Sequence, residues 1–366
     1  MRVHALLHGL SRILTLAFCA FVVVPAHAQD APRGDRPAPE KWQKLAPQAD
    51  ANGDGVLTVN EAKAFRKEGK KGKAQKSAAE AEGDAQPASP TSSDVSYGPH
   101  PRDILDFWKA ESSGPTPVLI YYHGGSFKAG DKSNVLTQPV FEACLKAGIS
   151  VVSANYRFSS DAPFPAPMLD GARAVQFVRF KAKEWNIDPE RVALSGGSAG
   201  GTMALWIALH DDLADPRSAD PVARESTRVR CVAAHGAPSV IQPDLIQKQT
   251  GARAVGGALA QLFGASTAEE LETPEMKKLT ADASPLTHAS KDDPPLFVIY
   301  HGRPSDTPFP ADAPQNLWIH HVCLGVPLKE KYDALGLEFQ IFSQDNPAPE
   351  GAELRFLQKQ VERDRE

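Results

Sequence analysis

The sequence predicts an α/β fold with a mostly parallel sheet for residues 94–366. Short apolar runs there alternate with longer segments of helical periodicity, as in strands joined by crossover helices. One apolar run, residues 192–194, leads through Gly-Gly-Ser-Ala-Gly at 196–200 into a helical segment at 202–210. G-x-S-x-G between a strand and a helix is typical of a sharp turn that exposes a serine, here Ser198, at the carboxyl edge of a sheet.

The remaining elements of this region follow from the same two periodicities. Apolar runs predict strands, and helical periodicity predicts helices. The strands are expected at 118–122, 149–154, 192–194, 229–234, 295–300 and 337–342, and the helices at 140–147, 168–181, 202–210 and 353–361. Residues 242–281 are expected to form helices over the cleft, where they would restrict access to the serine.

The composition excludes some classes of function. The net charge of −5, with 42% hydrophobic and 23% charged residues, is ordinary for a globular protein and not that of a nucleic-acid binder.

At the N-terminus, a basic start precedes an apolar stretch at 13–24 and an Ala-His-Ala sequence at 26–28. This pattern predicts that residues 1–28 are a signal peptide cleaved after Ala28, because the apolar stretch is too short for a stable membrane span. The protein is therefore expected in the periplasm or outside the cell.

Residues 29–68 predict a calcium-binding segment. The loop from Asp50 to Glu61 reads D-x-N-x-D-G-x5-E between two short helical stretches, which is the pattern of an EF-hand. Calcium takes six to eight oxygen ligands, and this spacing wraps them around one point. The expected ligands are Asp50, Asn52, Asp54, the carbonyl of Val56, Thr58 and a bidentate Glu61. One EF-hand only is visible, so the fold class is an α/β domain preceded by a single helical EF-hand.

A low-complexity stretch and three cysteines complete the chain. Residues 69–93 are rich in Lys, Ala, Glu, Pro and Ser, without apolar periodicity, and predict a flexible linker. Beyond the signal peptide remain Cys144, Cys231 and Cys323. Each lies among apolar residues. The sequence therefore leaves two alternatives: one disulfide between two of them, or three buried free thiols.

A second motif accompanies the serine. Tyr-His-Gly-Gly-Ser at 122–126 directly follows the first strong strand. Two glycines after a strand leave their N–H groups free to bind a developing oxyanion. The motif is of the H-G-G type, which acts with the N–H of the residue after the nucleophile. The predicted oxyanion donors are Gly124, Gly125 and Ala199.

These motifs together resemble those of α/β-hydrolase esterases, near carboxylesterases, feruloyl-esterase-like enzymes and hormone-sensitive-lipase-like proteins. The matching segments are 96–106, His-Gly-Gly-Ser at 123–126, Asn-Tyr-Arg at 155–157, 165–170 and 196–201, in the family's order. The resemblance covers roughly residues 94–345. It implies a doubly wound sheet and ester hydrolysis through an acyl-serine formed on Ser198.

The acid and base of this chemistry depart from the family. The strand at 295–300 is followed by His-Gly-Arg-Pro-Ser-Asp, so Asp306 is the predicted acid, one residue later than the family places it. The family's histidine after the last strand is absent, since no histidine follows His321. The adjacent His320 and His321 point in different directions, so at most one should face Ser198. We assign the base to His321, with His320 and His301 as the alternatives.

The sequence thus predicts a secreted serine hydrolase that cleaves carboxylic esters on a small molecule or a polysaccharide, with calcium held by the EF-hand and no cofactor in the hydrolase chemistry. A second hypothesis is a hydrolase fold that has lost its base and serves as a calcium-linked binding or structural protein. Neither nucleic acid nor a stable membrane span is expected.

Overall fold

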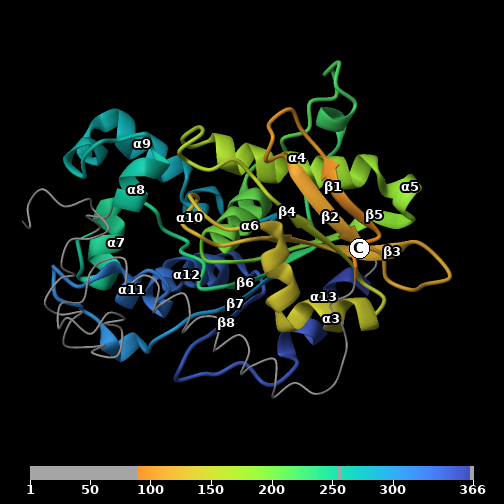
Figure 1. Ribbon diagram of the computed structural model, residues 1–366. Coiled ribbons are helices and arrows are strands. Elements are labelled where there is room, and N and C mark those ends of the chain that lie inside the picture. The colour runs from red at the N-terminus through yellow and green to blue at the C-terminus, as the bar shows by residue number, and fades with distance from the viewer. Residues whose placement is uncertain (1–88, 254–256, 363–366) are drawn as a thin grey trace, which may run out of the picture. The chain divides into compact units, whose positions relative to one another are not determined.

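The computed structural model describes residues 89–253 and 257–362, whose centre is one eight-stranded sheet (Figure 1). The strand order is β1-β2-β4-β3-β5-β6-β7-β8. β2 pairs antiparallel with β1 and with β4, and every pair from β4 to β8 is parallel. The strands are β1 (Ser92–Ser96), β2 (Ile104–Trp108), β3 (Thr116–Tyr122), β4 (Ser150–Ala154), β5 (Ile187–Gly197), β6 (Cys231–His235), β7 (Leu296–Ile299) and β8 (Phe339–Phe342).

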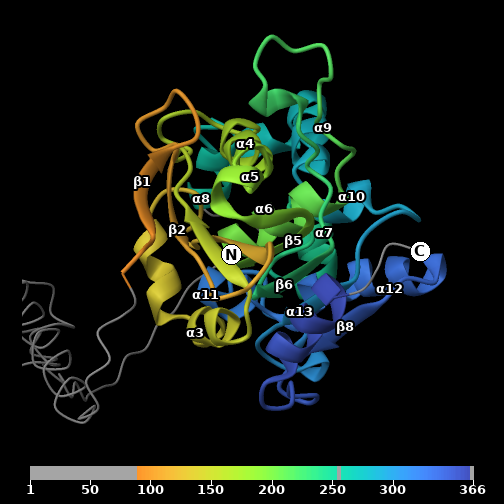
Figure 2. The same ribbon diagram turned by 90° about the vertical axis from the view of Figure 1, so that its right-hand side faces the viewer.

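Helices cover both faces of the sheet (Figure 2). α3 and α13 lie on one face, and α4, α5 and α6 on the other. The helices are α3 (Pro139–Lys146), α4 (Ala166–Phe180), α5 (Ala182–Trp185), α6 (Ala199–Leu209), α7 (Pro243–Thr250), α8 (Gly257–Leu262), α9 (Pro274–Asp282), α10 (Pro285–His288), α11 (Gln315–Trp318), α12 (Val326–Leu335) and α13 (Ala352–Glu362). Short 3-10 turns lie at Lys132–Thr137, Val222–Arg224, Glu269–Glu272, Pro304–Asp306 and Val322–Leu324.

The sheet strands are apolar on both faces because each face buries a separate core, as expected for parallel strands. The larger core lies under α4 and α6 and includes Met203 and Trp206; the second lies under α3 and α13 and includes Phe297. α6 is buried along its whole length, which explains why its sequence lacks an amphipathic pattern. A third, smaller cluster joins α7 to the segment from Trp318 to Leu324.

The predicted α/β fold is confirmed, with each expected strand and helix present within a few residues. The antiparallel β1 and β2 were not foreseen, because β1 is mostly polar and exposed and Asp106 interrupts the apolar run of β2. The expected helices between 242 and 281 are present as α7, α8 and α9. Cys144, Cys231 and Cys323 are buried free thiols, so the three-thiol alternative holds.

Three of the predictions concern residues outside the described ranges. The signal peptide, the EF-hand loop from Asp50 to Glu61 and most of the linker lie there, and they remain predictions. Within the described ranges no helix is long and apolar enough to cross a bilayer.

Candidate active site

The carboxyl ends of neighbouring strands bring the predicted motifs together. The registers pair Tyr122 of β3 with Gly196 of β5, and Gly197 of β5 with His235 of β6. The residues that follow these strands therefore meet at one edge of the sheet. Ser198 lies between the Gly-rich loop after β3 and the turn after β6.

Ser198 has the strained backbone of a nucleophile elbow. Its φ of 54° and ψ of −121° are rare for a residue with a side chain, and its N–H donates to the carbonyl of His235 at 2.7 Å. Glycine is required on both sides of the turn: a Cβ on Gly200 would overlap the carbonyl of Tyr122, and one on Gly196 would lie 2.5 Å from the carbonyl carbon of Gly200. The elbow predicted from the sequence is confirmed.

The base that the structure brings to Ser198 is His320. Its Nε2 lies 2.8 Å from the Ser198 Oγ, within hydrogen-bonding distance, and when Nε2 carries no proton the hydroxyl donates to it. The expectation that His321 faces the serine is wrong. The His321 side chain is 2% exposed and turned the other way, where its Nδ1 accepts from the N–H of Cys323 at 3.3 Å. His320 lies in the turn that follows α11, while His321 pairs with His301, and the two side chains leave the backbone in different directions, so only one of the pair reaches the site.

Asp306 lies beside His321, the histidine predicted as the base, and not beside His320, which contacts Ser198. Its Oδ2 lies 3.5 Å from the Nε2 of His321 and accepts from the N–H of Arg303 at 2.7 Å. Those contacts lower the pKa of the Asp306 carboxyl, the backbone hydrogen bond from Arg303 most. Among the described residues, no carboxylate oxygen lies within 4 Å of the His320 ring nitrogens. Asp306 thus caps a 3-10 turn rather than orienting the base.

Backbone pairing and packing hold His320 in place instead. Its carbonyl accepts from the N–H of His301 at 2.9 Å, and a bridge links His301 to His321, so the segment pairs with the chain just past the end of β7. On the other side, Trp318 is buried in the cluster shared with α7. The ring itself packs on Gly236, where an added Cβ would lie 3.1–3.2 Å from three of its carbons.

The environment of His320 favours its neutral form. Burial lowers the pKa of the imidazole below its usual range, and the nearby His301, with ring centroids 5.9 Å apart, adds to this. A neutral ring that accepts at Nε2 carries its proton on Nδ1. That tautomer is the one required of a general base toward a serine hydroxyl.

The Gly-rich loop lies directly beside the serine. A Cβ on Gly124 would lie 2.9 Å from the carbonyl of Gly197 and 3.4 Å from the Cβ of Ser198. Gly125 has a φ of +118°, and its carbonyl accepts from the N–H groups of Lys128 and Ala129 at 3.0 and 3.1 Å. Ala199 begins α6, where N–H groups lack partners within the helix. Gly124 and Ala199 therefore border Ser198; the role of Gly124, Gly125 and Ala199 as oxyanion donors remains a prediction.

A network that the sequence did not reveal supports this loop. The hydroxyl of Tyr156 donates to the carbonyl of His123 at 2.6 Å, and the rings of these two residues stack. Arg102 donates to the carbonyls of Tyr156 and Gly130 and contacts His123 Nε2 at 3.4 Å. Burial lowers the pKa of His123 to about 4, so this histidine stays neutral and acts as a support.

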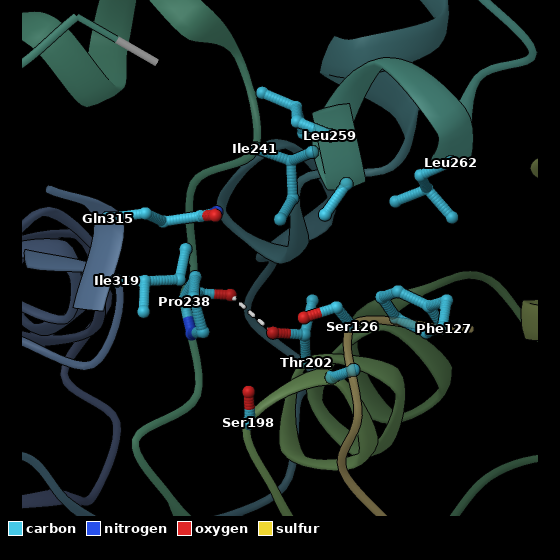
Figure 3. A pocket seen from close by; sticks show the side chains of 12 residues that line it. Ser126, Phe127, Ser198, Thr202, Pro238, Ile241, Leu259, Leu262, Gln315 and Ile319 are labelled. Atoms are coloured by element: carbon cyan, nitrogen blue, oxygen red, sulfur yellow. Dashed lines mark hydrogen bonds between the residues drawn. The ribbon is translucent and has the colours of Figure 1, made fainter. Parts of the chain in front are cut away.

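A small pocket opens next to the serine (Figure 3). Its volume is about 60 Å³. Ser198 lies on one side, with Ile241, Leu259 and Leu262 opposite it. The hydroxyl of Thr202 is engaged with the carbonyl of Pro238 at 3.0 Å, which leaves most of the lining apolar. The full lining is Ser126, Phe127, Ser198, Ala199, Thr202, Pro238, Ile241, Ala258, Leu259, Leu262, Gln315 and Ile319.

A doubly wound sheet that presents a serine on a strand-to-helix elbow, with histidine at its hydroxyl and a glycine loop beside it, defines an α/β-hydrolase. The model of the BD-FAE family matches residues 105–318. Because this match covers more than half of the 366 residues, the chain belongs to the BD-FAE family.

Relatives of known name agree with this assignment. The probable carboxylic ester hydrolase LipM of Mycobacterium tuberculosis is 32% identical over 214 residues, which are 57% of this chain and 47% of LipM. Esterase LipQ of the same organism is 28% identical over 212 residues, 57% of this chain and 48% of LipQ. The matched region is about half the length of these relatives.

Solved structures share the fold. A truncated carbohydrate esterase from gut microbiota superposes with a TM-score of 0.60 at 21% identity, covering 76% of this chain and all of the other. An acetyl ester-xyloside bifunctional hydrolase from Caldicellulosiruptor lactoaceticus gives 0.52 at 22%, covering 70% and 85%. At these identities the likeness concerns the fold.

Proposed function

We propose that this protein is a serine carboxylesterase that uses Ser198 as nucleophile and His320 as general base. The observation that carries the proposal is the 2.8 Å hydrogen bond between Ser198 Oγ and His320 Nε2 at a strained elbow. A serine hydroxyl is a weak nucleophile unless a base accepts its proton, and this contact supplies that base. It favours the enzyme over the hypothesis of a hydrolase fold without a base.

The reaction follows from these positions. Ser198 Oγ attacks the ester carbonyl while its proton passes to Nε2 of His320, and the N–H groups of Gly124, Gly125 and Ala199 stabilise the oxyanion. His320 then returns the proton to the departing alcohol oxygen, leaving an acyl-serine. Water attacks this ester by the same two steps, again through His320, and releases the acid.

The base works without a carboxylate partner among the described residues. In a triad the third group fixes the tautomer and stabilises the imidazolium that forms. Here packing on Gly236 and backbone pairing with His301 fix the ring, but no carboxylate of residues 89–253 and 257–362 lies beside it to neutralise its transient charge. We therefore expect a slower enzyme than one with a full triad, and one that suits activated or small esters.

The pocket points to a short acyl group. One water needs roughly 10–15 Å³ of cavity, so the volume of about 60 Å³ suits a group of a few non-hydrogen atoms. Its apolar lining fits the methyl end of an acetyl or propionyl group. The named relatives are carboxylic ester hydrolases and one structural neighbour is a carbohydrate esterase, so we propose an acetylated sugar or similar small ester as substrate.

The test is labelling by a fluorophosphonate probe together with turnover of p-nitrophenyl acetate. Wild type should show both, Ser198→Ala neither, and His320→Ala a turnover lowered by about 100- to 10,000-fold. The variant His321→Ala is the matched control, since it removes the neighbouring ring. A folded wild type that neither labels nor turns over ester would refute the proposal.

We also propose that the loop from Asp50 to Glu61 binds calcium and that the protein is exported after removal of residues 1–28. Both proposals rest on sequence patterns alone: a complete set of EF-hand ligand positions, and a basic start, apolar stretch and Ala-x-Ala site.

A further inference from the structure

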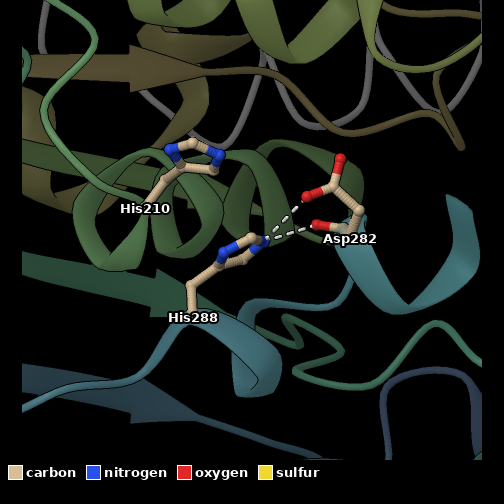
Figure 4. Close-up of side chains that lie close together, drawn as sticks. All are labelled: His210, Asp282 and His288. Carbon is tan, nitrogen blue, oxygen red and sulfur yellow. Dashed lines mark hydrogen bonds and ion pairs between the residues drawn. The ribbon is translucent and has the colours of Figure 1, made fainter. Parts of the chain in front are cut away.

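Two histidines and an aspartate converge at the far end of the helix that carries the serine (Figure 4). His210 directly follows α6, Asp282 ends α9 and His288 ends α10. One ligand atom from each lies within 4.8 Å of the other two. None of the three takes part in the proposed ester hydrolysis, because α6 separates them from Ser198 by about 16 Å along its axis.

The donor atoms are of the types that zinc and similar transition metals prefer, namely two imidazoles and one carboxylate. His210 Nδ1 faces the carbonyl of Asp211 at 3.1 Å, so the proton lies there and the Nε2 lone pair is free. A backbone carbonyl on the second ring nitrogen is the usual support of a metal-binding histidine. His288 Nε2 donates to the Asp282 carbonyl at 2.6 Å and lies 3.5 Å from its Oδ1.

The spacing suits one ion. In a tetrahedral site with bonds of about 2.0–2.2 Å, ligand atoms stand roughly 3.4 Å apart, which the pair from His288 and Asp282 already matches. The three ligand atoms lie within 4.8 Å of one another, so the His210 ring has to move closer to share the ion; its centroid is 4.6 Å from that of His288. An ion on Nε2 of His288 requires the tautomer with the proton on Nδ1, so the ring stays neutral and its hydrogen bond to the Asp282 carbonyl is replaced by the bond to the metal.

The surrounding scaffold is rigid, while the site stays open. The Trp206 ring packs against that of His210 at a tilt of 43°, and its indole N–H donates to the carbonyl of Asp282 at 2.8 Å, which ties α6 to α9. α10 packs against α6 and α12. The side chain of Asp282 is 51% exposed, so an ion can reach the site from solvent.

We propose that His210, Asp282 and His288 form a site for a divalent transition metal of the zinc class, which joins the end of α6 to α9 and α10. α9 is the last helix of the segment from 242 to 282, and α8 of the same segment lines the pocket. The ion would therefore fix the C-terminal end of this segment. Its role is structural, so binding is expected to stabilise the folded protein.

The experiment is a zinc titration of the purified protein against a chromophoric chelator, in saturating calcium so that the EF-hand is occupied. Wild type should bind one equivalent of zinc that His210→Ala/His288→Ala lacks or binds at least tenfold more weakly, and zinc should raise the Tm of wild type but not that of the double variant. His100→Ala is the matched control, because His100 is a partly buried histidine outside the cluster.

Single variants protect the test against misfolding. His210→Gln and Asp282→Asn keep the side-chain size and remove one ligand, and each should weaken zinc binding with its zinc-free Tm close to wild type. Equal zinc stoichiometry and affinity in wild type and all variants would overturn the proposal, as would an equal loss in His100→Ala.

Discussion

The imidazole of His320 rests on Gly236, a residue with a φ of +53° whose added Cβ would lie 3.1 Å from the Cβ of His320. This contact substitutes packing for the carboxylate that usually orients a catalytic histidine. Gly236 therefore positions the base, although it carries no side chain.

The first prediction concerns this contact. Gly236→Ala should displace the His320 ring and lower kcat for p-nitrophenyl acetate by more than tenfold, with a smaller change in KM. Gly336→Ala is the control: Gly336 also has a positive φ, +74°, but nothing lies within 4 Å of an added Cβ. Both variants carry backbone strain of about 1–2 kcal/mol, so a similar activity in the two would contradict the positioning role.

The second prediction concerns pH. The acidic limb of kcat/KM reports the pKa of the base in the free enzyme, since His320 must be neutral to accept the serine proton. Burial and His301 both lower the pKa of His320, so the midpoint should lie below the ordinary histidine value of about 6.5. His301→Gln removes one of these causes, and the midpoint should then move to higher pH. His100→Gln is the control, and its acidic midpoint should equal that of wild type. An unchanged midpoint in His301→Gln as well would rule out the influence of His301.

The third prediction separates the two adjacent histidines. His321 is buried, accepts from Cys323 N–H and meets the Phe309 ring edge-on at 5.1 Å. His321→Ala should therefore cost about 1–3 kcal/mol of folding stability, seen as a lower Tm, with kcat reduced far less than in His320→Ala. The reverse pattern, a stable but inactive His321→Ala, would restore the assignment made from the sequence.

Part of the site could be predicted from the sequence and part could not. The positions of Ser198 and Gly124 follow from local patterns, because the end of a strand and a glycine-rich turn are recognised from neighbouring residues. The choice between His320 and His321 depends on the bridge between His301 and His321, a pairing that no short-range pattern encodes. The positioning role of Gly236 could not be predicted for the same reason, because His320, the residue it contacts, lies 84 positions further along the chain.

A fourth prediction concerns calcium. Glu61→Gln should weaken calcium binding, because it removes one oxygen of the expected bidentate ligand. The predicted linker at 69–93 separates this loop from the hydrolase fold, so the Tm of the variant and its esterase activity should match wild type. Calcium binding is measured by isothermal titration with Glu68→Gln, an acid outside the loop, as control. Equal calcium affinity in wild type and Glu61→Gln would refute the site.

The last prediction concerns the length of the acyl chain. Ile241 lines the pocket opposite Ser198, and its replacement by alanine should lengthen the space for the acyl group. Ile241→Ala is expected to raise the ratio of butyrate to acetate hydrolysis, measured as kcat/KM on the p-nitrophenyl esters, by roughly the 10- to 200-fold that one to three kcal/mol allows. The control is Ile246→Ala, which opens a cavity in the cluster between α7 and the His320 segment without lining the pocket. Both changes should cost about 2–4 kcal/mol of stability, so only a shift in specificity confined to Ile241→Ala supports this pocket as the acyl site. The same shift in Ile246→Ala would show that the change in specificity comes from a general loosening of the helical segment from 242 to 282.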